Sequence, residues 1–219
     1  MNKKVLTMAV MAAVCGMAAA PVWAANSGGT VNGDGKFVGD NGAADNRLLI
    51  DEDSRQEIIS GLGTGNDKVQ NNSIEVSAGT ISERIIGGMS EGDGDIDYNS
   101  VTISGGKMSE AVYGAYTEGS GIVAYNSVTL TDGLINGEVY GGASTKNGIA
   151  EYNSVTVSGG TINMLATGGV SIDNVARYNN VTVTGGTIKG SIYGGMSEIN
   201  AIENLSLIHI SEPTRQAEI

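Results

Sequence analysis

Residues 152–158, YNSVTVS, and residues 178–184, YNNVTVT, are copies of a motif that recurs through the middle of the chain. In each copy, apolar residues alternate with Ser, Thr or Asn, which is the period of a strand with one buried face. A Gly-Gly pair and two shorter apolar runs follow. The repeat is 27 residues long, shortened to 26 in one place, and its copies start at Asn71, Tyr98, Tyr125, Tyr152 and Tyr178.

Aligning the copies places apolar residues at four shared offsets. The first strand carries two columns, which are Ile74, Val101, Val128, Val155 and Val181, and then Val76, Ile103, Leu130, Val157 and Val183. Two shorter strands carry one column each, which are Ile81, Met108, Ile135, Ile162 and Ile188, and then Ile85, Val112, Val139, Ala166 and Ile192. These columns predict one core shared by all copies.

Glycine and asparagine also hold fixed offsets. Glycines recur at positions 79, 106, 133, 160 and 186, and again at 87, 114, 141, 168 and 194. Glycines between strands indicate corners that need a positive φ or a close backbone approach. A further column consists of Asn72, Asn99, Asn126, Asn153 and Asn179. Because Asn tolerates the left-handed conformation and can hydrogen-bond to its neighbours in a stack, we predict a structural Asn ladder.

Short strands joined by glycine corners within a fixed repeat are typical of a β-solenoid. We therefore predict an all-β fold, a parallel β-helix of about five coils over residues 71–204. A β-sandwich is the alternative, since turns every 8–12 residues also fit that fold. Identical residues in each column favour in-register parallel stacking.

The N-terminus has the pattern of an export signal. Residues 1–24 combine Lys3 and Lys4 with an apolar run and small residues before Ala24, so we expect a helical signal peptide cleaved after Ala24. A buried N-terminal helix, or lipidation at Cys15, are the alternatives. Cleavage leaves a segment without cysteine, which needs no oxidative folding.

The C-terminal residues 205–219, LSLIHISEPTRQAEI, depart from the repeat. They resemble the conceptual translation of a transposase-type sequencing adaptor, so we expect a non-native tail and a repeat interrupted near Asn204. A genuine strand with a polar tail is the alternative. Continuing the register places Leu207 and His209 in the two columns of the first strand, whereas a slip of one residue places Ile208 and Ile210 there.

Residues 25–70 are rich in Gly, Asn and Asp, and we expect an N-terminal cap or leader there. Residues 63–69, GTGNDKV, resemble one turn of the calcium-binding nonapeptide repeat, with Asp67 as a candidate ligand. An acidic loop adds Asp93, Asp95 and Asp97 as further weak calcium candidates. Other copies lack these carboxylates, which favours a solvated loop.

Tyrosines form two columns. Tyr98, Tyr125, Tyr152 and Tyr178 form one, whereas Tyr113, Tyr140 and Tyr193 form another that Ile86 and Thr167 interrupt. A carbohydrate- or receptor-binding stripe is one interpretation. Aromatic stacking between coils is the interpretation that we favour.

The composition excludes several classes of function. The chain has 12 Lys and Arg against 24 Asp and Glu, a net charge of −12, whereas nucleic-acid binding requires a basic surface. Residues 25–204 contain neither His nor Cys, so Ser–His catalysis is excluded there. Glycoside hydrolysis by paired carboxylates is chemically possible, but no pair recurs in the repeat. We expect no catalytic residues and no cofactor.

A signal peptide followed by cysteine-free YNSVTVSGGTI repeats resembles the passenger region of Gram-negative autotransporters, the type V secreted proteins. The resemblance covers residues 1–24 and about 71–204. It implies export to the cell surface, a structural or adhesive role toward a host surface or glycan, and an outer-membrane β-barrel beyond this chain. The runners-up are a β-helical carbohydrate-active enzyme and a calcium-dependent extracellular repeat protein.

Overall fold

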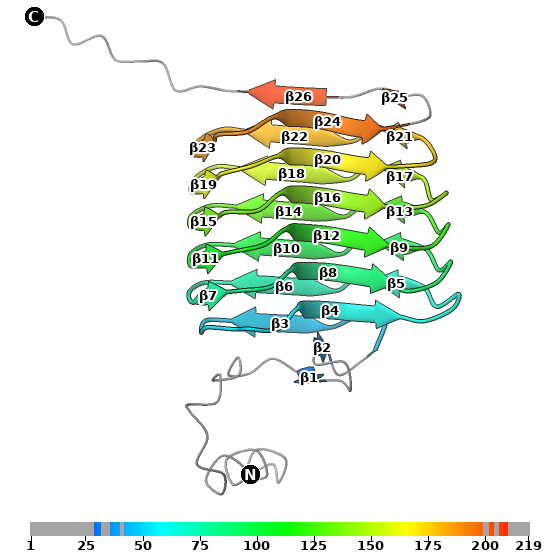
Figure 1. The fold of residues 1–219 in the computed structure, drawn as a ribbon, viewed down its shortest axis with the longest axis horizontal. Helices are drawn as coiled ribbons and strands as arrows, with labels where there is room; N and C mark the ends of the chain where they lie inside the picture. Colours follow the sequence, from blue (N-terminus) through cyan, green and yellow to red (C-terminus); the bar gives the residue numbers. More distant parts are fainter. Residues whose placement is uncertain (1–28, 32–35, 40–41, 199–201, 204–205, 210–219) are drawn as a thin grey trace, which may run out of the picture.

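The computed structural model describes residues 29–31, 36–39, 42–198, 202–203 and 206–209. These residues form a parallel β-solenoid of about six coils, and the described part contains no helix. The coils stack along one axis so that equivalent strands align (Figure 1). The predicted fold class is thus confirmed, whereas the helix expected over residues 1–24 lies outside the described residues.

Each full coil contains four strands, two of them short. The second coil contains β6 (Ser73–Val76), β7 (Thr80–Ile81), β8 (Ile85–Ser90) and β9 (Ile96–Asp97). The third contains β10 (Ser100–Ile103), β11 (Lys107–Met108), β12 (Val112–Thr117) and β13 (Val123–Ala124). The fourth contains β14 (Ser127–Leu130), β15 (Leu134–Ile135), β16 (Val139–Ser144) and β17 (Ala150–Glu151). The fifth contains β18 (Ser154–Val157), β19 (Thr161–Ile162), β20 (Ala166–Ser171) and β21 (Ala176–Arg177). The sixth contains β22 (Asn180–Val183), β23 (Thr187–Ile188), β24 (Ile192–Ser197) and β25 (Ile202–Glu203).

Equivalent strands of successive coils pair in parallel and form four sheets of eight, seven, six and five strands. Pairing is in register, so that Val101 lies beside Ile74 on one side and Val128 on the other. The same register continues through Val155 and Val181. In-register pairing of identical columns is what the sequence predicts.

The stack begins earlier than the repeat predicts. β3 (Arg47–Ile50), β4 (Ile58–Gly63) and β5 (Val69–Gln70) form a first coil within the segment expected to be a cap or leader. Leu48 and Ile50 pair with Ile74 and Val76, so this coil keeps the inward apolar residues of the repeat. Its outward residues differ from those of the later copies.

A short hairpin lies against the first coil. β1 (Gly29–Val31) pairs antiparallel with β2 (Phe37–Gly39), and β2 pairs in parallel with β4. The Phe37 side chain is buried and joins the core at the N-terminal end of the stack. This is the place at which a solenoid needs a cap over its exposed first coil.

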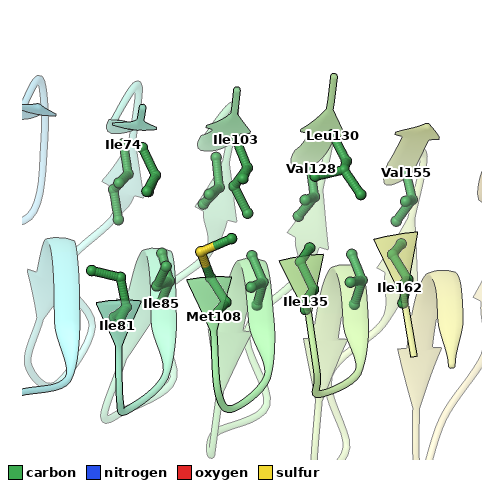
Figure 2. Close-up of a cluster of buried hydrophobic side chains, with 14 of the residues drawn as sticks. Ile74, Ile81, Ile85, Ile103, Met108, Val128, Leu130, Ile135, Val155 and Ile162 are labelled. Carbon is green, nitrogen blue, oxygen red and sulfur yellow. The ribbon is translucent and has the colours of Figure 1, made fainter. Parts of the chain in front are cut away.

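The core is one continuous column of apolar side chains inside the coils. Ile74, Ile103 and Leu130 project from the first strand of each coil toward Ile81, Met108, Ile135 and their neighbours on the shorter strands (Figure 2). These side chains are fully buried. Because each coil contributes only four such residues, the coils depend on their neighbours for burial.

Two kinds of corner turn the chain. Gly79, Gly106, Gly133, Gly160 and Gly186 have φ between +70° and +105°, which confirms the predicted glycine corners. The second corner precedes the first strand of each coil. There the residue with the left-handed backbone conformation lies one position before the residue of the Asn column. These residues are Asn71, Tyr98, Tyr125, Tyr152 and Tyr178, with φ between +54° and +57°. The left-handed conformation expected of the Asn column was therefore misplaced by one residue.

The Asn column forms the predicted ladder. The Nδ2 atoms of Asn72 and Asn99 donate to the Oδ1 atoms of Asn99 and Asn126 at 2.8 and 2.9 Å. The ladder continues through Asn153 to Asn179 at 3.0 and 3.1 Å, and Asn46 of the first coil extends it at 2.8 Å. All of these side chains are buried. Such a column is stable because each buried amide has partners on both sides.

Glycine makes room for this ladder. A Cβ at Gly88 or Gly142 lies only 2.6 Å from the side chain of Asn99 or Asn153. The preceding glycines permit close approach of coils, since a Cβ at Gly87 lies 2.4 Å from the carbonyl oxygen of Gly114. The Gly-Gly pair of the long strand is therefore required by two different contacts.

β26 (Ser206–His209) continues the seven-stranded sheet beyond the sixth coil. Its backbone pairs Leu207 with Val181 and His209 with Val183, so the register continues without a slip. In this register the Asn column falls at position 205, which is Leu and lies outside the described residues.

Candidate binding face

The outer surface of the seven-stranded sheet carries a regular array of hydroxyl groups over four coils, with one amide, that of Asn180, in place of a hydroxyl. Four rows run along the solenoid axis, one residue of each row per coil, and we call these residues the hydroxyl face. They are Tyr98, Tyr125, Tyr152 and Tyr178; Ser100, Ser127, Ser154 and Asn180; Thr102, Thr129, Thr156 and Thr182; and Ser104, Thr131, Ser158 and Thr184. Successive coils are about 4.8 Å apart, so the hydroxyls repeat at that interval.

Alternation positions these side chains. The inward residues Val128 and Leu130 are fully buried, whereas the outward residues Ser127 and Thr129, which alternate with them, are half-buried and Thr131 is exposed. Thr is a favourable residue for such a half-buried strand surface. The flat array therefore follows directly from a parallel sheet that keeps its register.

Most of the central hydroxyls are available to solvent or a ligand. Within the described structure, the two middle rows form no side-chain hydrogen bond to the protein in three successive coils, at Ser100, Thr102, Ser127, Thr129, Ser154 and Thr156. Each of these hydroxyls can both donate and accept.

The hydroxyl face contains no charged residue in a chain of net charge −12. Among the side chains of this sheet that the structure describes, charged ones lie at its N-terminal end, where Arg47 and Glu75 approach within 3.5 Å. The surface is suited to a neutral polar ligand, because it offers hydrogen-bond donors and acceptors rather than ion-pair partners. The outward Ser and Thr positions were visible in the motif, but sequence reasoning did not single them out.

The tyrosine row forms one edge of the hydroxyl face, and we call it the tyrosine ladder. The rings of Tyr98, Tyr125, Tyr152 and Tyr178 stack with centroids 5.0, 4.9 and 4.8 Å apart and interplanar angles of 4–7°. Stacking between coils, the interpretation favoured from the sequence, is confirmed. Because neighbouring rings cover each other's faces, the ladder presents ring edges and hydroxyls to solvent, and sugar stacking on internal ring faces is blocked.

The second tyrosine column lies on the outer surface of the eight-stranded sheet. Tyr113 and Tyr140 stack at 5.0 Å, and Thr167 separates Tyr140 from Tyr193 in the register. Burial raises the pKa of Tyr113 to about 12 and also raises the pKa of Tyr140, whose hydroxyl donates to Glu138 at 2.6 Å. These phenols therefore stay neutral and act as packing groups.

The calcium candidates divide between two coils, with Asp67 between β4 and β5, Asp93 and Asp95 together between β8 and β9, and Asp97 on β9. Asp67 Oδ2 accepts from Thr64 within its own turn, whereas Asp97 forms an ion pair with Lys68 at 2.8 Å. Asp93 Oδ1 accepts from the backbone and hydroxyl of Ser120 at 2.9 and 2.7 Å, and these bonds lower the pKa of Asp93.

Asp95 Oδ1 accepts from the backbone of Ile122 at 2.8 Å, so this carboxylate, like Asp93, links one coil to the next. Among the described residues, no three His, Cys, Asp or Glu side chains gather in a geometry that could hold a metal ion.

Two positive groups, those of Lys36 and Arg84, lie near the N-terminal end of the eight-stranded sheet. Lys36 lies 3.5 Å from Glu57, and Arg84 also pairs with Glu57. The Arg84 guanidinium stands 5.5 Å over the Tyr116 ring. Tyr116 also packs against an apolar cluster that contains Ile59 and Ile86, both fully buried.

No protein-family model matches the chain. No curated protein matches it either, and no solved structure does so. Among the residues that the structure describes, none forms a helix long and apolar enough to span a membrane.

Proposed function

We propose that this chain is part of an exported bacterial surface passenger of the autotransporter type, with a structural or adhesive role and no catalytic activity of its own. The observation that carries this proposal is the β-solenoid itself, in which coils from Arg47 onward stack in an unbroken register. Such a stack lengthens along one axis as coils are added and needs only contacts between neighbouring coils. The resemblance of the signal segment and the repeats to autotransporter passengers supplies the cellular context.

The hydroxyl face supports the adhesive form of this proposal. A row of hydroxyls that repeats once per coil suits a linear neutral glycan, whose sugars present hydroxyls at a comparable interval along the chain. The absence of charge from the face disfavours sialylated or uronic-acid glycans as ligands. We therefore propose that a neutral glycan of a host surface lies along the axis over Ser127, Thr129 and their equivalents.

Surface display tests the passenger role. Residues 1–203 would be fused to the outer-membrane barrel of another autotransporter and expressed in a Gram-negative host. We expect protease added outside intact cells to degrade the repeats, and deletion of residues 1–24 to abolish this degradation. Repeats that become protease-accessible only after lysis contradict the proposal.

Adhesion is tested with the same displayed chain. Thr129→Lys places a charge in the middle of the hydroxyl face and should weaken binding of cells to immobilised neutral glycans. Thr161→Lys is the matched control, because Lys107 already occupies the equivalent position on the five-stranded sheet. Display without glycan binding in the unsubstituted chain would leave the structural role and contradict the adhesive one.

A further inference from the structure

The tyrosine ladder combines stacking with exposure. Its four rings are 41–57% exposed although each is stacked on a neighbour. The same left-handed backbone carries all four residues, so each ring leaves its coil in the same direction. Stacking of a solvent-exposed phenol on the equivalent phenol of the next coil thus recurs along the stack.

This geometry brings oxidisable groups together. Residues 25–204 contain no Trp and no Cys, so Tyr and Met are the readily oxidised side chains of this segment. Nearly parallel rings with centroids about 5 Å apart bring ortho carbons of adjacent phenols close to each other. Bonding requires the two rings to turn out of their parallel stack about the side-chain torsions, since an aryl–aryl bond lies in the plane of both rings, and the exposed position of the ladder leaves room for this turn.

We propose that the tyrosine ladder is a site of oxidative cross-linking, at which hydrogen peroxide and a haem peroxidase join tyrosines of successive coils as dityrosine. Each of two phenols loses one electron and one proton and becomes a tyrosyl radical. The two radicals form one carbon–carbon bond through their ortho positions, and the two ortho hydrogens move to the phenolic oxygens. Peroxide takes up the two electrons and two protons and is reduced to two molecules of water.

The expected consequence is a covalent tie between coils. Tyr152 and Tyr178 are 26 positions apart in the sequence, so a bond between them closes a loop of one whole coil. Closing such a loop reduces the conformational freedom of the unfolded chain, as a disulfide does. A segment without cysteine would in this way acquire a cross-link that thiol reductants do not break. The inference depends on the stacking geometry and not on the adhesive role.

The chain contains its own control. Tyr193 is 44% exposed, similar to Tyr178 at 41%, but its neighbour in the register on β20 is Thr167. Within the described residues Tyr193 has no stacked ring partner. Exposure alone therefore predicts equal reactivity of the two tyrosines, whereas the ladder geometry predicts that Tyr178 reacts and Tyr193 does not.

The test uses the full chain with a haem peroxidase and hydrogen peroxide, followed by tryptic peptide mapping. Peptides 147–177 and 178–189 each contain a single tyrosine, Tyr152 and Tyr178, so their covalent product identifies that bond. We expect this product in monomeric protein, at a yield independent of dilution and several-fold higher than in urea-unfolded chain. Tyr152→Phe should remove it and Tyr193→Phe should leave it unchanged.

Two results would overturn the inference. One is a yield of the 147–177 to 178–189 product that is equal in native and unfolded chain. The other is cross-linking of Tyr193 as efficient as that of Tyr178, which would show that exposure and not stacking determines reactivity. Unchanged dityrosine fluorescence in the Tyr152→Phe, Tyr125→Phe double variant would argue against the ladder in the same way.

Discussion

Replacing Asn126 by alanine should destabilise the fold by about 4 kcal/mol. Its Oδ1 accepts the backbone N–H of Asn99 at 2.9 Å, and its Nδ2 donates to Ile96, Ala124 and Asn153 at 2.9–3.0 Å. Alanine leaves the buried N–H of Asn99 without a partner, which costs about 1–3 kcal/mol. The Nδ2 group has two hydrogens, which its three acceptors share, so losing them adds about 0.5–1.5 kcal/mol for each hydrogen.

The measurement is equilibrium unfolding in urea, followed by circular dichroism at the β-sheet band. Ser127→Ala is the matched control, since its outward hydroxyl has no partner in the described structure, and we expect its effect to stay within about 0.5 kcal/mol. Asn126→Asp should be worse than alanine at neutral pH, because a carboxylate would face three oxygen atoms. A loss of less than about 1 kcal/mol for Asn126→Ala would refute the ladder as a structural element.

Three further predictions concern corners, burial and surface charge. Gly106→Ala should lower the free energy of unfolding in urea by about 2 kcal/mol or more, since φ is +81° and the new Cβ would lie 2.7 Å from a backbone oxygen. Gly65→Ala is the comparison, because Gly65 has φ of +63° but open space around it, and it should cost about 1 kcal/mol. The pKa of Tyr113 is raised, so the folded state holds the phenolic proton more tightly than the unfolded chain does. This contribution to stability should be complete below pH 10 and should be lost as the pH rises toward about 12. Tyr113→Phe should therefore make the urea midpoint of unfolding fall less steeply over this range. Lys68→Ala should change the free energy of unfolding by less than about 1 kcal/mol, because the Lys68 side chain is 52% exposed and its charge is solvated. A larger loss would indicate that Asp97, whose side chain is only 15% exposed, depends on this partner.

The sequence predicted the coil well where the residues repeat. In-register columns such as Val101 and Val128 could be recognised because the same physical demand acts on every coil. The first coil could not be recognised in the same way. Its inward residues Leu48 and Ile50 are retained, but its outward residues and glycine offsets differ from those of the later copies.

The candidate site was harder to predict than the fold. The Asn ladder followed from one column of identical residues, yet the left-handed backbone belongs to the preceding Tyr98 and its equivalents. A bulky residue is not the one that conformational preference selects there, and ring stacking between coils stabilises the choice. The hydroxyl face was not predicted from the sequence, because Ser and Thr are ordinary residues at the outward positions of a single strand. Only their repetition over four coils forms a continuous surface.

The Asn ladder also has a consequence for how the gene can change length. Each internal coil presents the same amide to the coil before it and the same backbone and amide N–H groups to the coil after it. Deleting one whole copy, such as residues 98–124, would therefore bring together two surfaces that are already complementary. Unequal recombination between copies can then lengthen or shorten the stack by whole coils. A partial deletion would instead shift all columns out of register at the point of deletion.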